Sequence, residues 1–156
     1  RRLREHARGT LDAAGVVALS GDERLVGTGG TLRNLAKVDQ RAQDYPIPRL
    51  HGYILSRRRV HEIVASLCGE RIKRRAGVPG LNADRRDSIV GGGLVIDTLM
   101  DLLGAEEVVR RAYQSVLGRD PDPSSRGYID RVLRDHWSEG DVARELRNSD
   151  EYRSKN

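Results

Sequence analysis

The sequence contains few residues of the kinds that build disulfides, metal centres or membrane spans. Its 156 residues include no Phe, one Trp, one Met and one Cys. The single cysteine, Cys68, excludes an intramolecular disulfide and a cysteine-based zinc site, and it favours a reducing, cytoplasmic setting. Cys68 falls on the apolar stripe of an expected helix, which predicts a buried thiol. No stretch approaches the ~20 consecutive apolar residues of a transmembrane helix, and no signal peptide is recognisable, so we expect no membrane span.

Charged residues of both signs are abundant, with a small excess of cations. The chain has 28 Lys and Arg against 23 Asp and Glu, which gives a net charge of +5. This excess favours polyanionic partners such as polyphosphate, nucleotides or nucleic acid. The arginine clusters at 57–59 and 71–75 are either solvated helix ends or a rim that attracts phosphates. Because no aromatic side chains are interleaved with them, nucleic acid ranks last among these partners.

A glycine-rich stretch, Gly27-Thr28-Gly29-Gly30-Thr31, lies between a short apolar run, Arg24–Val26, and a helical pattern from Leu32 to Val38. A strand, a glycine turn and a helix start in this order expose backbone N–H groups to an anion. The glycines allow close approach of a phosphate, Thr31 is the expected N-cap, and Thr28 adds a hydroxyl donor. The spacing is neither G-x-x-x-x-G-K-[ST] nor a full G-x-G-x-x-G. A tight turn that binds nothing is therefore the alternative.

A second stretch repeats this arrangement further along the chain. Arg85 to Val90 read as a strand, Gly91-Gly92-Gly93 as a turn, and Val95 to Leu103 as a helix. Two such units predict an α/β layer with a mainly parallel pair of strands. Because ligands of open α/β sheets gather at the carboxyl ends of strands, both glycine turns are expected to lie near one ligand.

After Gly104 the sequence predicts helices only, without an intervening linker. Ser138 is an expected N-cap, with Asp141 at the capping-box position. The predicted helices span Glu106–Leu117, Pro123–His136 and Ser138–Leu146, with a last turn near Tyr152. Their predicted core consists of large side chains, namely Tyr113, Val116, Leu117, Tyr128, Val132, Leu133, Trp137, Val142, Leu146 and Tyr152. The chain thus divides into an α/β part, residues 1–104, and a small all-α domain, residues 105–156.

Two polar features have structural interpretations that we favour over metal binding. His61 lies beside the buried stripe of the helix that begins at Ser56, and no second ligand stands at metal spacing, so a solvated or capping histidine is favoured. Asp120-Pro121-Asp122-Pro123 ends one helix and begins the next. Ca²⁺ binding there is the alternative to a capping turn in which Arg119 is paired locally. The turn is favoured because the EF-hand spacing and glycine are missing.

Several short motifs up to about Gly104 follow one another in an order and spacing that are specific when taken together. They are Val26–Thr31 with Leu35-Ala36, His51-Gly52 with Leu55-Ser56, Pro79-Gly80-Leu81, and Arg85, Asp87 and Ile89 before the second glycine turn and Ile96. In these motifs the chain resembles the exopolyphosphatase and guanosine pentaphosphate phosphohydrolase (Ppx/GppA) family of the actin and sugar-kinase superfamily.

The resemblance implies a fold, a site and a ligand. The fold is the second half of a ribonuclease-H-like second lobe. The phosphate site is Gly27, Thr28, Gly29, Gly30 and Thr31, and the nucleotide side is Gly91, Gly92 and Gly93 with Arg85 close to the ligand cleft. The implied partners are polyphosphate or guanosine pentaphosphate, with Mg²⁺ as the cofactor.

The departures from the family pattern concern catalysis. The family's N-terminal Asp-Ile-Gly-Ser loop, its catalytic glutamate and its later Asp-Ile-Gly-Gly-Gly-Ser loop do not occur here. The residues that the family uses as general base and as metal ligands are therefore missing, and no catalytic or metal-ligating residue is assigned. We expect the isolated chain to be inactive. It begins inside an Arg-rich helix without an initiator Met, which indicates a fragment whose partner is a missing N-terminal lobe or a second copy in a homo-oligomer.

The C-terminal part carries a different resemblance. Glu107 to Tyr113, Leu117 to Asp122 and Ser149 to Tyr152 resemble a bacterial helical domain of unknown function that is similar to phycobilisome linker domains. Two functions follow. One is a fragment of a phosphoanhydride hydrolase that retains a phosphate-binding turn, and the other is a non-catalytic interaction or assembly module built on the helical domain. The dependence of binding on salt concentration distinguishes the two functions, because polyanion binding weakens steeply as salt rises, whereas protein assembly need not.

Overall fold

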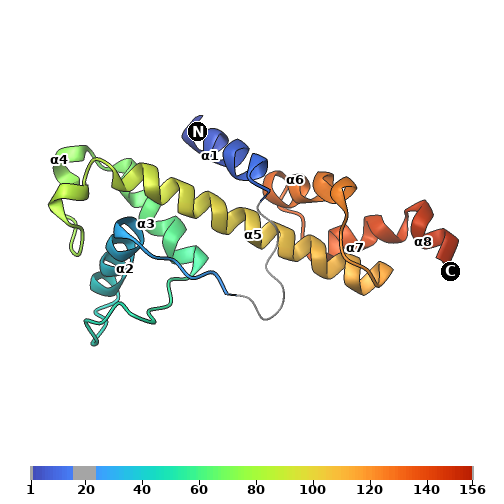
Figure 1. Ribbon diagram of the computed structural model, residues 1–156, viewed down its shortest axis with the longest axis horizontal. Helices are drawn as coiled ribbons and strands as arrows, with labels where there is room; N and C mark the ends of the chain where they lie inside the picture. The colour runs from blue at the N-terminus through green and yellow to red at the C-terminus, as the bar shows by residue number, and fades with distance from the viewer. Residues whose placement is uncertain (1, 16–23, 156) are drawn as a thin grey trace. The chain divides into compact units, whose positions relative to one another are not determined.

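The computed structural model describes residues 2–15 and 24–155, and these residues fold into helices and loops alone. The α-helices, labelled in Figure 1, are α1 (Arg2–Ala13), α2 (Gly30–Ala42), α3 (Arg57–Gly69), α4 (Ile72–Arg75), α5 (Ile89–Leu117), α6 (Arg126–Arg134), α7 (Glu139–Arg147) and α8 (Asp150–Lys155). Two short 3-10 helices, η1 (Ala83–Arg85) and η2 (Pro123–Ser125), precede α5 and α6. In the ranges described, no helix is both long and apolar enough to cross a bilayer.

The expected α/β fold with a partial ribonuclease-H-like lobe is wrong, because the described ranges contain no strand. Residues 24–28 are exposed and irregular, and no backbone hydrogen bond pairs them with another described segment. An apolar run without a neighbouring segment cannot form a ladder. The second expected strand, Arg85 to Val90, is not formed either. Arg85 is the last residue of η1, and Ile89 and Val90 are the first residues of α5.

The expected second glycine turn is also wrong, since Gly91, Gly92 and Gly93 lie inside α5. Each glycine in a helix costs about 1 kcal/mol relative to alanine, so a packing reason is required. A Cβ on Gly92 would lie 2.7 Å from Oγ1 of Thr31, and one on Gly93 would lie 2.9 Å from Cγ2 of Val64. These two glycines therefore let α5 approach α2 and α3 closely.

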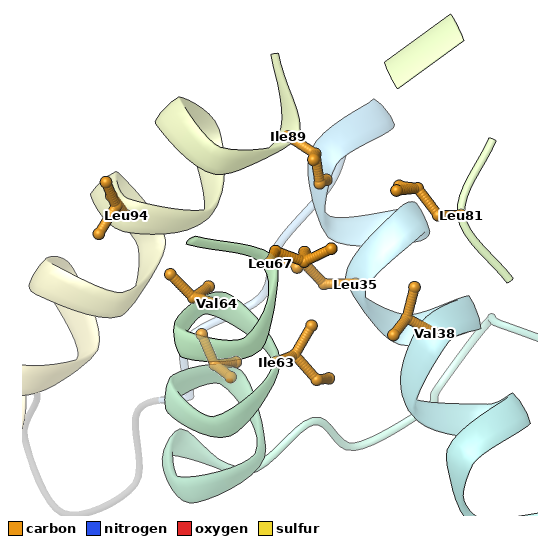
Figure 2. Close-up of a cluster of buried hydrophobic side chains, with 9 residues drawn as sticks. Leu35, Val38, Ile63, Val64, Leu67, Leu81, Ile89 and Leu94 are labelled. Atoms are coloured by element: carbon orange, nitrogen blue, oxygen red, sulfur yellow. The ribbon is translucent and has the colours of Figure 1, made fainter. Parts of the chain in front are cut away.

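The chain divides into two compact units, one formed by residues 2–13 and 25–100 and the other by the residues from 101 onward, with α5 contributing to both. The core of the first unit comes from α2, α3 and the start of α5. Leu35, Val64 and Ile89, one from each helix, are almost fully buried. Figure 2 shows these side chains gathered with Val38, Ile63, Leu67, Leu81 and Leu94.

Helix α3 follows its sequence pattern except at its end. Ser56 is the N-cap, with its hydroxyl accepting from the N–H of Arg59 at 3.3 Å, as predicted. The predicted stripe of Val60, Ile63, Val64 and Leu67 is buried. The prediction of a buried Cys68 is wrong, because this thiol is exposed. Cys68 follows Leu67 by one residue, a rotation of about 100° around the helix, and α3 ends at the next position.

The second unit confirms most of its predicted core. Tyr113, Leu117, Val142 and Leu146 are buried. The predicted residues that pack against them are Val116, Tyr128, Val132, Trp137 and Tyr152. Ile129, which was not predicted, joins this cluster, whereas the predicted Leu133 does not belong to it. The predicted capping box is present, since the hydroxyl of Ser138 accepts from the N–H of Asp141 and the carboxylate of Asp141 accepts from the N–H of Ser138. The helices expected on either side of Gly104 are one continuous helix, α5.

Candidate functional site

The first glycine stretch forms the exposed N-terminus of α2. Gly29 is the N-cap with φ 101° and ψ 175°, a conformation that favours glycine, and no side chain caps the helix. The expected cap Thr31 is instead the second residue of the helix, and its side chain lies against Gly92. The first ordinary backbone bond joins the N–H of Arg33 to the carbonyl of Gly29 at 3.1 Å. The N–H groups before Arg33 lack helical partners and remain as donors for an anion.

Gly27 has a packing role in addition to its place in the predicted loop. A Cβ on this residue would lie 2.1 Å from Cδ1 of Leu32, so any larger residue here would force the Leu32 side chain to move. Thr28 is exposed and, with Gly27 and Gly29, leaves the start of α2 open to solvent. Any ligand at this helix end is therefore held in contact with water, where charge interactions are screened.

Arg85, which the sequence analysis placed near the ligand, lies at the same helix end. A Cβ on Gly30 would be 3.0 Å from Nη2 and 3.2 Å from Cζ of Arg85. In the described part of the chain, the guanidinium of Arg85 makes no hydrogen bond or ion pair. A cation without a partner thus stands beside free N–H donors and the positive end of a helix dipole.

The loop that carries Arg85 is fixed to α2 by two contacts. Gly80 adopts φ 87°, and a Cβ there would lie 2.5 Å from the carbonyl oxygen of Lys37. The buried amide of Asn34 donates from Nδ2 to the carbonyl of Gly30 at 2.8 Å and accepts with Oδ1 from the N–H of Asn82 at 2.8 Å. Asn34 therefore links the helix start to the Arg85 loop. The sequence analysis missed this residue, whose only local signal is its place four positions after Gly30.

The predicted nucleotide-side glycines differ from the first stretch in one decisive respect. They lie in a helix whose hydrogen bonds are already formed, for example from the N–H of Gly92 to the carbonyl of Ser88 at 3.2 Å. Gly93 is buried, whereas Gly91 is exposed with open space around its Cα. The structure brings Gly92 close to Thr31, but as a helix contact rather than a turn.

A buried carboxylate network fixes the segment between α2 and α3. Asp39 is 3% exposed and accepts from the hydroxyl of Tyr53 at 2.7 Å and from Nε of Arg59 at 2.7 Å. Burial and the hydrogen bond to Asp39 raise the pKa of the Tyr53 hydroxyl to about 12. Gln40 holds the same segment by donating to the carbonyl of Arg49 at 2.9 Å. Both oxygens of Asp39 are used for structure, so this carboxylate is not a candidate general base.

His61 has a carboxylate neighbour that sequence spacing did not reveal. Its Nδ1 lies 3.3 Å from Oδ1 of Asp97, a fully buried residue of α5. The other oxygen of Asp97 forms an ion pair with Arg4 of α1. The three residues are 36 and 93 positions apart, beyond the reach of a local pattern. Arg4 therefore compensates the charge of the buried carboxylate of Asp97.

The acidic loop of the second unit is a capping turn, as the sequence analysis favoured. Asp122 caps η2 by accepting from the N–H of Ser124 at 2.8 Å. Arg119 contacts Asp122 at 3.0 Å and Glu151 at 2.6 Å. The hydrogen bonds from the hydroxyl and the N–H of Ser124, and to a smaller extent the charge of Arg119, hold the pKa of Asp122 below its usual range. The carboxylate of Asp122 is thus engaged with the protein's own cation, and that of Asp120 accepts from Nε2 of Gln114 at 2.9 Å.

Comparison with known proteins gives one match. A model of the Ppx/GppA phosphatase family matches residues 1–113. Neither the curated proteins nor the solved structures contain a match. The matched range includes the start of α2, the Arg85 loop and most of α5.

Proposed function

The chain belongs to the Ppx/GppA phosphatase family, and from this premise we propose that the N-terminus of α2 and Arg85 bind the phosphates of polyphosphate or guanosine pentaphosphate. The family gives the chain a phosphatase-related origin. The observation that carries the proposal is the guanidinium of Arg85, which lies beside Gly30 without a partner among the described residues. Backbone N–H donors and a guanidinium together match the oxygen acceptors of a phosphate.

The assigned binding residues are Gly27, Thr28, Gly29, Gly30 and Thr31, with Arg85 as a second contact. Mg²⁺, which the family resemblance implies, does not fit this donor set. Mg²⁺ prefers carboxylate, phosphate and water oxygens, whereas these residues offer N–H groups, hydroxyls and a cation. The proposed binding therefore uses no metal ligand from these residues.

We further propose that this stretch of chain binds phosphate without hydrolysing it. Attack of water on a phosphoanhydride requires a base or a metal to activate the water. Within the described ranges, the buried carboxylates near α2 and α3 are Asp39 and Asp97, and each is engaged by an arginine. With Mg²⁺ and polyphosphate present, the purified chain is expected to release no phosphate at an enzyme-like rate.

Titration with tripolyphosphate, monitored in ¹H–¹⁵N correlation spectra, tests the proposal. Binding is expected to shift the amide signals of residues 29–33. Arg85→Gln is expected to weaken binding about tenfold, because a charge-assisted hydrogen bond contributes roughly 1.5 kcal/mol at an exposed site. Arg86→Gln is the matched control, since Arg86 is the next residue and its side chain lies 3.8 Å from Asp87. Equal losses in the two variants would mean that binding depends on net charge and not on this site.

An assembly module in the second unit is the other candidate function. It is favoured by a cavity of about 640 Å³ whose lining combines Val109, Pro121 and Ile129 with Arg110 and Asp122. Mixed apolar and charged walls suit a protein segment better than a free phosphate. Light scattering would detect such association. Assembly that persists at high salt, without a response to tripolyphosphate, would favour this function over anion binding.

A further inference from the structure

An apolar cavity of about 300 Å³ opens beside the start of α2. Its walls come from the segment before α2, from α2 itself, from the segment that precedes α3, and from α5. Its lining includes Leu25, Val26, Leu32, Ala36, Leu99 and Met100. Gly27, the first residue of the proposed anion loop, also lines it, so the cavity and the anion loop share a rim. Val26 is 81% exposed, which leaves this side of the cavity uncovered within the described structure.

The polar side chains that line the cavity are either positively charged or neutral. Among the residues whose structure is described, Arg33 is the only charged one in the lining. No described residue forms a hydrogen bond or ion pair with the guanidinium of Arg33. Tyr53 also lines the cavity, but its hydroxyl already donates to Asp39 at 2.7 Å. A ligand therefore meets apolar walls and one cation that lacks a partner.

We infer that this cavity holds the apolar group of a phosphate ester whose phosphate lies at the start of α2. The inference rests on the proposed phosphate site and adds the chemical class of the ligand. Charge complementarity supports it, because Arg33 attracts an anionic head and no acidic residue of the described ranges lines the cavity. A volume of about 300 Å³ lies at the lower end of small-molecule pockets and suits a short alkyl chain or one ring. An inorganic polyphosphate would leave these apolar walls in water.

Three probes separate the head group from the apolar group: methyl phosphate, hexyl phosphate and 1-hexanol. Hexyl phosphate is expected to bind at least about tenfold more tightly than methyl phosphate, since burying two methylene groups corresponds to that factor. Its amide shifts are expected at Ala36 and Met100 as well as at residues 29–33. 1-Hexanol is expected to bind more weakly than hexyl phosphate because it cannot use Arg33.

Two variants test the location. Ala36→Leu fills the cavity and is expected to bring the ratio of hexyl to methyl phosphate affinity close to one, while Ala65→Leu, on an exposed position of α3, keeps the ratio. Arg33→Gln leaves the cavity open and is expected to weaken hexyl phosphate about tenfold without changing the affinity of 1-hexanol, because the start of α2 and Arg85 still hold the phosphate. Arg41→Gln, near the end of the same helix, is its control. A dispersed spectrum of each variant verifies that it is folded.

The outcomes distinguish the inference from the function on which it rests. If methyl phosphate and tripolyphosphate bind but hexyl phosphate binds no more tightly than methyl phosphate, the inference is overturned and the phosphate site stands. If tripolyphosphate and methyl phosphate both fail to bind, the proposed function and the inference fall together. Equal affinities of 1-hexanol and hexyl phosphate would overturn the inference, as would self-association that hexyl phosphate does not reverse, since a second copy would then cover the cavity.

Discussion

Replacing Gly80 with alanine tests how the Arg85 loop is held against α2. Gly80 has φ 87°, and its Cβ would lie 2.5 Å from the carbonyl oxygen and 2.8 Å from the backbone nitrogen of the facing helix residues, Lys37 and Val38. Left-handed backbone costs an alanine about 1–2 kcal/mol. Because the crowded atoms belong to the backbone, no side-chain rotation relieves the contact, and the loop must move at a further cost of roughly 1–3 kcal/mol. We expect Gly80→Ala to destabilise the first unit by about 2–5 kcal/mol.

Gly52→Ala is the matched control for Gly80→Ala. Gly52 has φ 74°, but nothing lies within 4 Å of its Cβ position. It therefore incurs the backbone cost of about 1–2 kcal/mol without the contact. Urea unfolding followed by the amide signals of α2 measures both losses in the same unit. If Gly80→Ala loses no more stability than Gly52→Ala, the close packing of the loop on α2 is refuted.

The remaining predictions concern α5, Tyr53 and α7. Gly91→Ala is expected to raise stability by up to about 1 kcal/mol, because Gly91 lies in a helix with open space around it, whereas Gly93→Ala is expected to lower stability through contact with the Val64 side chain. Destabilisation by Gly91→Ala in urea unfolding would indicate a turn. The raised pKa of Tyr53, about 12, means that its stabilising contribution is complete below pH 10 and is lost between pH 10 and 12. An ultraviolet titration of the wild type against Tyr53→Phe, which lacks that phenol, checks this midpoint. Ser138→Ala is expected to cost about 1 kcal/mol by removing the cap of α7, measurable by thermal unfolding.

Features that depend on neighbouring residues were predictable from the sequence. Ser56 and Ser138 were assigned as helix caps, and the segment from Asp120 to Pro123 as a capping turn. These assignments were possible because a cap needs only a short polar side chain two or three residues before its N–H partner. The aromatic core of the second unit followed from helical spacing in the same way. These interactions are local, so their residues lie within one or two turns of sequence.

The strand predictions failed because a short apolar run before glycine is compatible with two structures. Ile89-Val90 followed by three glycines fits a strand and a turn, and it fits equally the start of a helix that must pack closely. The choice depended on Thr31 and Val64, which lie 61 and 29 residues before Gly92 and Gly93 and leave no space for a Cβ. Contacts of this range, like that of Asn34 with Asn82, are invisible to periodicity.

The two glycine stretches show why the same composition leaves N–H groups without helical partners at one place and not at the other. At Gly29 the backbone turns into a helix, so the N–H groups that follow have no carbonyl behind them and stay available. At Gly92 the helix has already begun, and the N–H is bonded to Ser88. At Gly29, glycine allows a backbone conformation with positive φ. At Gly92, glycine allows two helices to pack closely. An anion site therefore requires the glycines to stand before the first helical hydrogen bond, and only the stretch beside Arg85 meets that condition.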